Sequence, residues 1–408
     1  MVFFSFLRDS IKEVLNGGKV YWTWMLTLVF FSFLGVFTYV GQFQTGLIKT
    51  GMSDQVSWGL YVANFTYLVG MAAAAVMIVI PTYIFHQESA KRVVILGEGL
   101  AVASTIMCVL FVTVDMGRPD RLWHLLPVIG RFNWPLSLLT WDVAVLQGYM
   151  LLNLLVPMYI LFHRYAGKSY NHKLVFLLAI VSMFWAFSIH TVTAFLFSSN
   201  AARPFWHVSL LAPKFIASAF TAGPAFIIIA FRIIKTRTTF EIPDKIINLL
   251  ALIVTVAMQI NLFMLGAEIF TEFYSETSHS ASAHYLFLGL KGLNGLVPWI
   301  YTAIFMNVVA LMLLMFHKTR TNTNTLTVAC ILAAVGVWIE KGMGFVVPGF
   351  IPTPLGEIQE YLPTFTEVKV SVGVWAIGLL VFTALVKAAI PIEDDKLRYR
   401  ETGSPPVV

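Results

Sequence analysis

Long apolar stretches separated by short polar breaks run along almost the whole chain, and this pattern predicts its fold. A helix needs about 20 apolar residues to cross the hydrocarbon core of a bilayer. Ten stretches are long enough, and the breaks between them carry Gly, Pro, Asn or charged residues, as loops do. We therefore expect an all-α integral membrane protein with about ten transmembrane helices. The predicted spans lie near residues 20–40, 58–84, 93–114, 137–162, 174–197, 208–232, 246–271, 293–316, 325–347 and 369–390.

The composition supports a membrane location. Of the 408 residues, 58% are hydrophobic and 12% are charged, whereas about 25% of the residues in a soluble domain are charged. The first residues contain no apolar segment followed by a small-residue cleavage site, so we interpret residues 1–19 as an amphipathic cytoplasmic segment and not as a signal peptide. Residues 391–408 are expected to form a cytoplasmic tail.

The distribution of positive charge predicts the orientation. The net charge of +6 could indicate a nucleic-acid partner. However, about twice as many Lys and Arg residues lie at one end of the predicted spans as at the other, which favours membrane topology. We expect both termini on the cytoplasmic side of the inner membrane, which requires an even number of spans. The opposite side has longer aromatic loops, which are expected to dock a partner or host the chemistry.

The Cys and His residues limit which redox centres the chain can hold. Cys108 and Cys330 cannot supply the four thiolates of an iron–sulfur cluster, so any cluster is expected on a partner. A b-type haem in a membrane usually needs two His ligands at one depth. His190 has no obvious deep partner in the sequence, and we expect neither haem b nor another metal site.

Ionisable residues inside the predicted spans are candidates for proton transfer, because burying them in a membrane is costly. Several have structural alternatives: an interhelical hydrogen bond for His190, solvation at a helix end for Glu268 and Glu272, and charge neutralisation between neighbouring helices for Glu340 with Lys341. Glu98 either reaches the inner interface or starts a proton route. The candidate pathway residues are Glu98, Glu88, His86, His190, Glu268, Glu272 and Glu340.

The densest group of candidate residues surrounds the loop after the third span. Carboxylates in a low dielectric have raised proton affinity, and indole rings form flat apolar walls. A quinone head group needs both, together with hydrogen-bond partners for its two oxygens. The alternative is an aromatic belt in which an Arg–Asp pair braces the loop. The residues of this group are Asp115, Arg118, Arg121, Trp123, His124, Trp141 and Asp142.

Several segments together resemble the NrfD/PsrC family of polytopic quinone-interacting subunits, and within it the ten-helix members of the DsrP, Hmc and Qrc types. The resemblance covers nearly the whole chain, and the segments occur in the family's order. They are Trp58-Gly59 with Asn64-Phe65 and Gly70, Asp115-Met116-Gly117-Arg118-Pro119, Trp141-Asp142, Arg203-Pro204-Phe205-Trp206-His207, and residues 347–364 with their repeated Pro and Gly.

The resemblance implies two four-helix bundles, formed by spans 2–5 and 6–9 and flanked by spans 1 and 10. It implies a menaquinone or menaquinol site at the outer end of the first bundle, where Asn64 and Trp58 join the loop residues. It also implies a periplasmic ferredoxin-like iron–sulfur partner, with a multihaem cytochrome c and further redox subunits as additional partners, in a respiratory complex that could be linked to sulfite reduction.

Two alternatives belong to other functional classes. A secondary transporter usually has matching broken helices in its two halves. Gly223-Pro224 interrupts the sixth span, but the corresponding part of the second span, near Gly70, lacks a Pro. The other alternative is a proton-translocating subunit without a redox site of its own.

Overall fold

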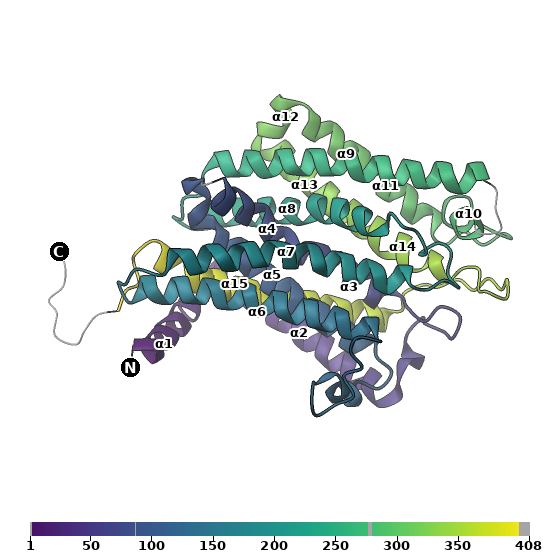
Figure 1. Cartoon of the computed structure of the whole chain (residues 1–408), viewed down its shortest axis with the longest axis horizontal. Coiled ribbons are helices and arrows are strands. Elements are labelled where there is room, and N and C mark those ends of the chain that lie inside the picture. The colour runs from purple at the N-terminus through teal and green to yellow at the C-terminus, as the bar shows by residue number, and fades with distance from the viewer. Residues whose placement is uncertain (1, 86, 276–279, 400–408) are drawn as a thin grey trace.

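The computed structural model describes residues 2–85, 87–275 and 280–399, with the backbone only at Glu88, and these residues form a helical protein (Figure 1). Ten helices among them are long and apolar enough to span a membrane, which confirms the predicted number. Eight are α2 (Lys19–Thr45), α5 (Glu88–Asp115), α6 (Leu138–Tyr165), α7 (His172–Ser198), α8 (Leu211–Arg237), α9 (Asp244–Ser275), α11 (Val297–Met315) and α15 (Phe365–Glu393).

The second and ninth spans are not regular α-helices. The second comprises α3 (Leu60–Ala72), a 3-10 turn η2 (Ala73–Ala75), α4 (Val76–Val79) and a π-helical turn η3 (Ile80–Ile84). The ninth comprises α13 (Thr323–Trp338), a π-helical turn η6 (Ile339–Met343), α14 (Gly344–Val346) and η7 (Pro348–Phe350). Because π-helical turns often occur at functional sites, the charged residues of η6 are candidates for a functional role.

The long helices run roughly parallel, so the molecule has two ends (Figure 1). We call the end with α1 (Val2–Val14) and the end of α15 the basic face. We call the opposite end, with the short helix α10 (Ala281–Phe287), the loop face. The assignment of the basic face to the cytoplasm, and the grouping of the helices into two bundles, remain predictions.

Small residues allow the central helices to approach closely. A Cβ added to Gly223 of α8 would lie 2.5 Å from the Cβ of Ala74, and one added to Gly35 of α2 would lie 2.5 Å from the Cα of Gly373 in α15. Lipid tails are as apolar as the helices, so membrane helices associate largely through such close packing. The α3 span consequently lies buried among α5, α7, α8 and η6.

Aromatic packing seals part of the loop face. Trp206, buried in the loop between α7 and α8, stacks on Trp58 with ring centroids 5.5 Å apart, and Phe197 and Phe350 pack edge-on against both indoles. The Trp206 indole N–H donates to the carbonyl of Phe345 at 2.9 Å. The loops after α2 and α7 and the turn η7 are therefore joined in one packed layer.

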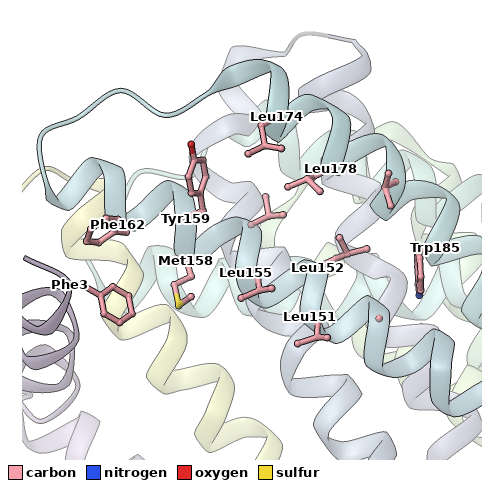
Figure 2. Close-up of a pocket in the computed structure, with 13 residues that line it drawn as sticks. Phe3, Leu151, Leu152, Leu155, Met158, Tyr159, Phe162, Leu174, Leu178 and Trp185 are labelled. Carbon is pink, nitrogen blue, oxygen red and sulfur yellow. The ribbon is translucent and has the colours of Figure 1, made fainter. Parts of the chain in front are cut away.

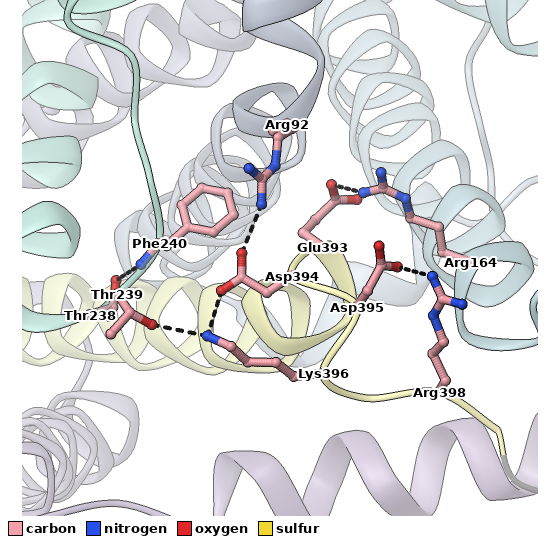
Figure 3. Close-up of polar contacts among 10 residues, drawn as sticks. All are labelled: Arg92, Arg164, Thr238, Thr239, Phe240, Glu393, Asp394, Asp395, Lys396 and Arg398. Carbon is pink, nitrogen blue, oxygen red and sulfur yellow. Dashed lines mark hydrogen bonds and ion pairs between the residues drawn. The ribbon is translucent and has the colours of Figure 1, made fainter. Parts of the chain in front are cut away.

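Ion pairs join the end of α15 to the other helices at the basic face (Figure 3). Arg164 of α6 pairs with Glu393, and Arg92 of α5 pairs with Asp394 at 2.8 Å. Lys396 also bonds Asp394, at 2.9 Å. These contacts hold the start of the C-terminal segment against α5 and α6.

Candidate functional site

The loop between α5 and α6 keeps Arg118 away from the two candidate carboxylates. Its guanidinium donates to both oxygens of Asp120, at 3.0 and 2.9 Å, and both residues are exposed. Hydrogen bonding from Arg118 lowers the pKa of Asp120. The predicted bracing Arg–Asp pair thus exists, but within the loop. Arg121 is also exposed, on the 3-10 helix η4 (Pro119–Leu125).

The aromatic residues of this loop form two separate stacks. Trp123 stacks on His124 with centroids 3.8 Å apart. Trp134 stacks on Trp141 at 4.7 Å, and the Trp141 indole N–H donates to the carbonyl of Pro135 at 2.7 Å. The hydrogen bond fixes the Trp141 ring at the start of α6, where it forms a flat wall at the loop face.

Asp142 is the best-defined polar group in the interior of the first helices. Its side chain is buried, and its Oδ1 accepts a 2.6 Å hydrogen bond from the Thr193 hydroxyl of α7. His190 lies one turn before Thr193 on the same face of α7. It is fully buried, and neither ring nitrogen has a hydrogen-bond partner among the described residues.

Two further groups face this region from other helices. Cys108 of α5 interacts electrostatically with both Asp142 and Lys341, and Lys341 interacts with His190. We call Asp142, Thr193, His190, Cys108 and Lys341 the central polar cluster. Its members come from α5, α6, α7 and the π-helical turn η6, of which α5, α7 and η6 pack against α3.

Glu340 and Lys341 point to different surroundings although they are adjacent in η6. The Glu340 carboxylate accepts from the amides of Asn261 and Asn307, at 2.8 to 3.2 Å. The Lys341 ammonium donates to the carbonyl of Phe215 at 3.3 Å and lies over the Phe215 ring. The Glu340 carboxylate also interacts electrostatically with Lys214 of α8, and Lys214 forms an ion pair with Glu268 of α9. Glu272 lies one turn beyond Glu268.

Asp115 ends α5 beside a second polar network. One of its oxygens is buried without a hydrogen-bond partner among the described residues, and the carboxylate interacts electrostatically with Glu367. Glu367 is fully buried and accepts from the Tyr361 hydroxyl at 2.5 Å and from the backbone N–H of Gly51 at 2.7 Å and Thr364 at 2.9 Å. Burial raises the pKa of Tyr361, so this hydroxyl remains a donor.

Asn64 positions two indoles. Its Oδ1 accepts from Trp338 at 3.0 Å and from Trp375 at 2.9 Å, and its amide donates to the carbonyl of Leu60 at 2.8 Å. Both indoles line a cavity of about 400 Å³ together with Tyr67 and other apolar residues. Asn64 therefore supports an aromatic wall, and Trp58 belongs to the sealed aromatic layer.

The Asn64→Ala variant should unfold more easily than the wild type, because two indole N–H groups lose their acceptor. Each unsatisfied buried donor costs about 1–3 kcal/mol, so the expected loss of unfolding free energy is about 2–6 kcal/mol. Tryptophan fluorescence during thermal unfolding in detergent measures the change. Asn324→Ala, at an exposed position near the start of α13, is the matched control. Equal unfolding midpoints for Asn64→Ala and the wild type would contradict this role.

The described residues include only part of the predicted proton route near the basic face. Glu98 is buried with one oxygen unpartnered among the described residues, and it interacts electrostatically with Tyr149 and Glu393. The Tyr149 hydroxyl is likewise buried without a partner in the described part of the chain. His86 and the side chain of Glu88 lie outside the described residues.

Several residues that interact with the candidate residues in the structure were not identified from the sequence. Glu367 had a recognisable signal, since Thr364 and Glu367 form a capping box ahead of an apolar run. Thr193, Asn261 and Asn307 had none, because single polar residues in apolar helices do not reveal their partners. Within the described ranges, no group of three or more His, Cys, Asp or Glu residues could hold a metal ion.

Comparison with known proteins decides the family. Residues 48–347 match the model of the family described as "Polysulphide reductase, NrfD". The chain belongs to the NrfD family. As an NrfD-family protein with ten candidate spans, it is a multi-pass membrane protein.

Relatives of this NrfD-family chain are similar over nearly their full length. It is 26% identical to a Halobacterium salinarum protein provisionally named as a membrane subunit of dimethyl sulfoxide reductase, over 89% of each chain. It is 25% identical to the Hdr-like menaquinol oxidoreductase integral membrane subunit of Archaeoglobus fulgidus, covering 94% of this chain and 97% of the relative. It is 22% identical to a subunit of the selenate reductase of Mesobacillus selenatarsenatis, covering 95% and 97%. All three relatives are named as parts of larger enzymes.

Proposed function

We propose that this chain is the quinone-binding membrane subunit of a respiratory electron-transfer complex, which exchanges electrons between menaquinone or menaquinol and an iron–sulfur partner. The observation that carries the proposal is Asp142, a buried carboxylate held by Thr193 beside the unpartnered His190. The name of the Archaeoglobus relative, a menaquinol oxidoreductase subunit, supports the choice of quinone.

In this proposal, the quinone head group binds near the loop-face ends of α5 and α6. The Trp134–Trp141 stack provides an aromatic wall, and Asp142 provides a proton-active group one residue further along α6. Oxidation of one quinol releases two protons and two electrons. Asp142 and Asp115 accept the protons, and the electrons pass to clusters on a partner docked at the loop face. Arg118, Arg121, Trp123 and His124 lie on the loop that such a partner would contact.

The proton route in this proposal involves buried groups on both sides of the central polar cluster. His190 belongs to the cluster itself, while Glu98 with Tyr149 lies nearer the basic face. Glu340 and the Lys214–Glu268 pair lie on the side of α8, α9 and α11. We place the basic face in the cytoplasm, following the excess of Lys and Arg there.

Quinone binding to the purified chain tests the proposal. A menaquinone analogue should quench tryptophan fluorescence in a saturable manner, because Trp141 and Trp134 lie at the proposed site. The double variant Asp115→Asn with Asp142→Asn should weaken this binding about tenfold, the loss of roughly one charge-assisted hydrogen bond. Unchanged affinity in the double variant would remove both carboxylates from the site.

The subunits that co-purify with the chain test the assignment to a complex. A cluster-bearing protein bound at the loop face is the expected result, and a sulfite-reductase-linked complex is the specific assembly proposed. Purification of the chain alone, with solute uptake by proteoliposomes that contain only this protein, would instead support a transporter.

A further inference from the structure

A membrane-facing groove lies apart from the central polar cluster, between α1, α6 and α7 (Figure 2). It encloses about 580 Å³, which is within the usual range of small-molecule sites. The part of α6 that lines it runs from Gly148 to Phe162, so at about 1.5 Å per residue the groove extends on the order of 20 Å. The hydrocarbon core is about 30 Å thick, so the groove covers roughly the two-thirds of it nearer the basic face.

The lining has very few groups that could hydrogen-bond to a polar head group. The side chains are aliphatic or aromatic, and only Tyr159 and Trp185 among them carry hydrogen-bonding groups. The Tyr159 hydroxyl accepts from the backbone N–H of Asn171 at 3.2 Å, and the Trp185 indole N–H donates to the carbonyl of Val145 at 2.7 Å. The indole N–H is thus already engaged, and the O–H of Tyr159, near the basic face, is the one side-chain donor of the lining that can still bind a ligand. The rest of the groove suits a hydrocarbon chain.

The two ends of the groove differ. At the deep end, Trp185 packs directly on Gly148, where an added Cβ would lie 2.3 Å from the ring. At the end near the basic face, Phe3 of α1 packs edge-on against Phe162 with centroids 5.8 Å apart. A chain lying in the groove would thus enter beside α1, at the level of lipid head groups, and end beyond the middle of the membrane.

Positive charge without a carboxylate partner gathers at that entrance. Lys168 and Lys173, in and after the short loop that joins α6 to α7, are exposed, and neither forms an ion pair among the described residues. Neighbouring cationic side chains do have carboxylate partners. Arg164 pairs with Glu393, and the Nζ of Lys12 lies 3.8 Å from the Oδ1 of Asp9. The two lysines therefore remain available to a negatively charged head group.

We propose that this groove binds one acyl chain of an anionic glycerophospholipid, whose phosphate is held by Lys168 and Lys173. An apolar groove that lies under two unpaired lysines matches both parts of such a lipid. Lysines near a membrane surface attract anionic lipids individually, and their contributions add. The site is distinct from the proposed quinone site, which lies at the opposite face, and does not depend on it.

Native mass spectrometry of the full-length protein, released from nanodiscs of mixed phosphatidylglycerol and phosphatidylcholine, tests the proposal. The wild type should retain phosphatidylglycerol in preference to phosphatidylcholine. Lys168→Gln with Lys173→Gln should lower phosphatidylglycerol retention about 30-fold. Leu155→Trp, which fills the groove with a larger ring, should lower the retention of both lipids.

Matched controls separate this site from general charge and surface effects. Lys245→Gln removes an exposed lysine at the start of α9, and Leu252→Trp enlarges an exposed side chain on the same helix. Both should retain lipid as the wild type does. Equal retention of the two lipids by the wild type would overturn the proposal. Wild-type retention in both Leu155→Trp and the double lysine variant would do the same. If the wild type retained a quinone in place of a phospholipid, and Leu155→Trp lost that quinone, the proposal would also be overturned.

Discussion

Asp142→Asn is expected to lower menaquinol oxidation by the assembled complex at least about 100-fold, the lower end of the usual contribution of a general acid or base. Asn is nearly isosteric with Asp, and its side-chain oxygen can still accept from the Thr193 hydroxyl. The helix contact should therefore survive while the capacity to accept a proton is lost. The measurement is the steady-state rate of quinol-dependent reduction of an electron acceptor by the purified complex.

The surface carboxylate Asp244 provides the control. It begins α9 at the basic face, where it is exposed and paired with Lys235, so Asp244→Asn should keep the wild-type rate. Thr193→Val should give an intermediate rate, because it removes the donor that positions Asp142 but leaves the carboxylate. A wild-type rate for Asp142→Asn in a fully assembled complex would show that quinol is deprotonated elsewhere.

Glu367→Ala should produce the largest loss of stability. Glu367 is fully buried, and it accepts from the Tyr361 hydroxyl and from two backbone N–H groups that belong to different loops. Removal of the carboxylate leaves these donors without an acceptor, at about 1–3 kcal/mol each. The expected loss is about 3 kcal/mol or more of unfolding free energy, measured from thermal unfolding in detergent at one fixed scan rate.

Two variants show whether the loss belongs to this network. Glu357→Ala removes an exposed glutamate from the loop before α15 and should leave the unfolding midpoint unchanged. Glu367→Gln keeps one acceptor oxygen and should recover part of the loss. If Glu367→Ala unfolded with the same midpoint as Glu357→Ala, the network would not hold the loops of the loop face together.

The number of membrane helices could be predicted because it depends on one local quantity, the length of each apolar stretch. The helices of the structure extend a few residues beyond most predicted spans, since helical hydrogen bonding continues past the hydrocarbon into the interfacial residues. The ionisable residues within the spans were also visible in the sequence, and Asp142, Glu98, His190 and Glu340 are indeed buried. Membrane burial makes such residues rare, and their rarity makes them conspicuous.

The partners of these residues could not be predicted in the same way. Asn64 meets the indoles of Trp338 and Trp375, which are 274 and 311 positions away in the sequence. Arg118 could have paired with Asp115, Asp120 or Asp142, and the folded loop selects Asp120. Helices that are apolar on all sides do not indicate which side faces the interior. That choice depends on close contacts between small residues, such as Gly223 with Ala74.

Apolar length and charge distribution therefore establish, from local sequence, a ten-helix protein with a basic face and a loop face. The central polar cluster exists only because α5, α7 and η6 pack against α3 and α6 packs against α5 and α7. A hydrogen bond such as that from Thr193 to Asp142 depends on the positions of two helices to within a fraction of an ångström. Helix length alone does not specify such positions, so the arrangement of the site is a property of the tertiary structure.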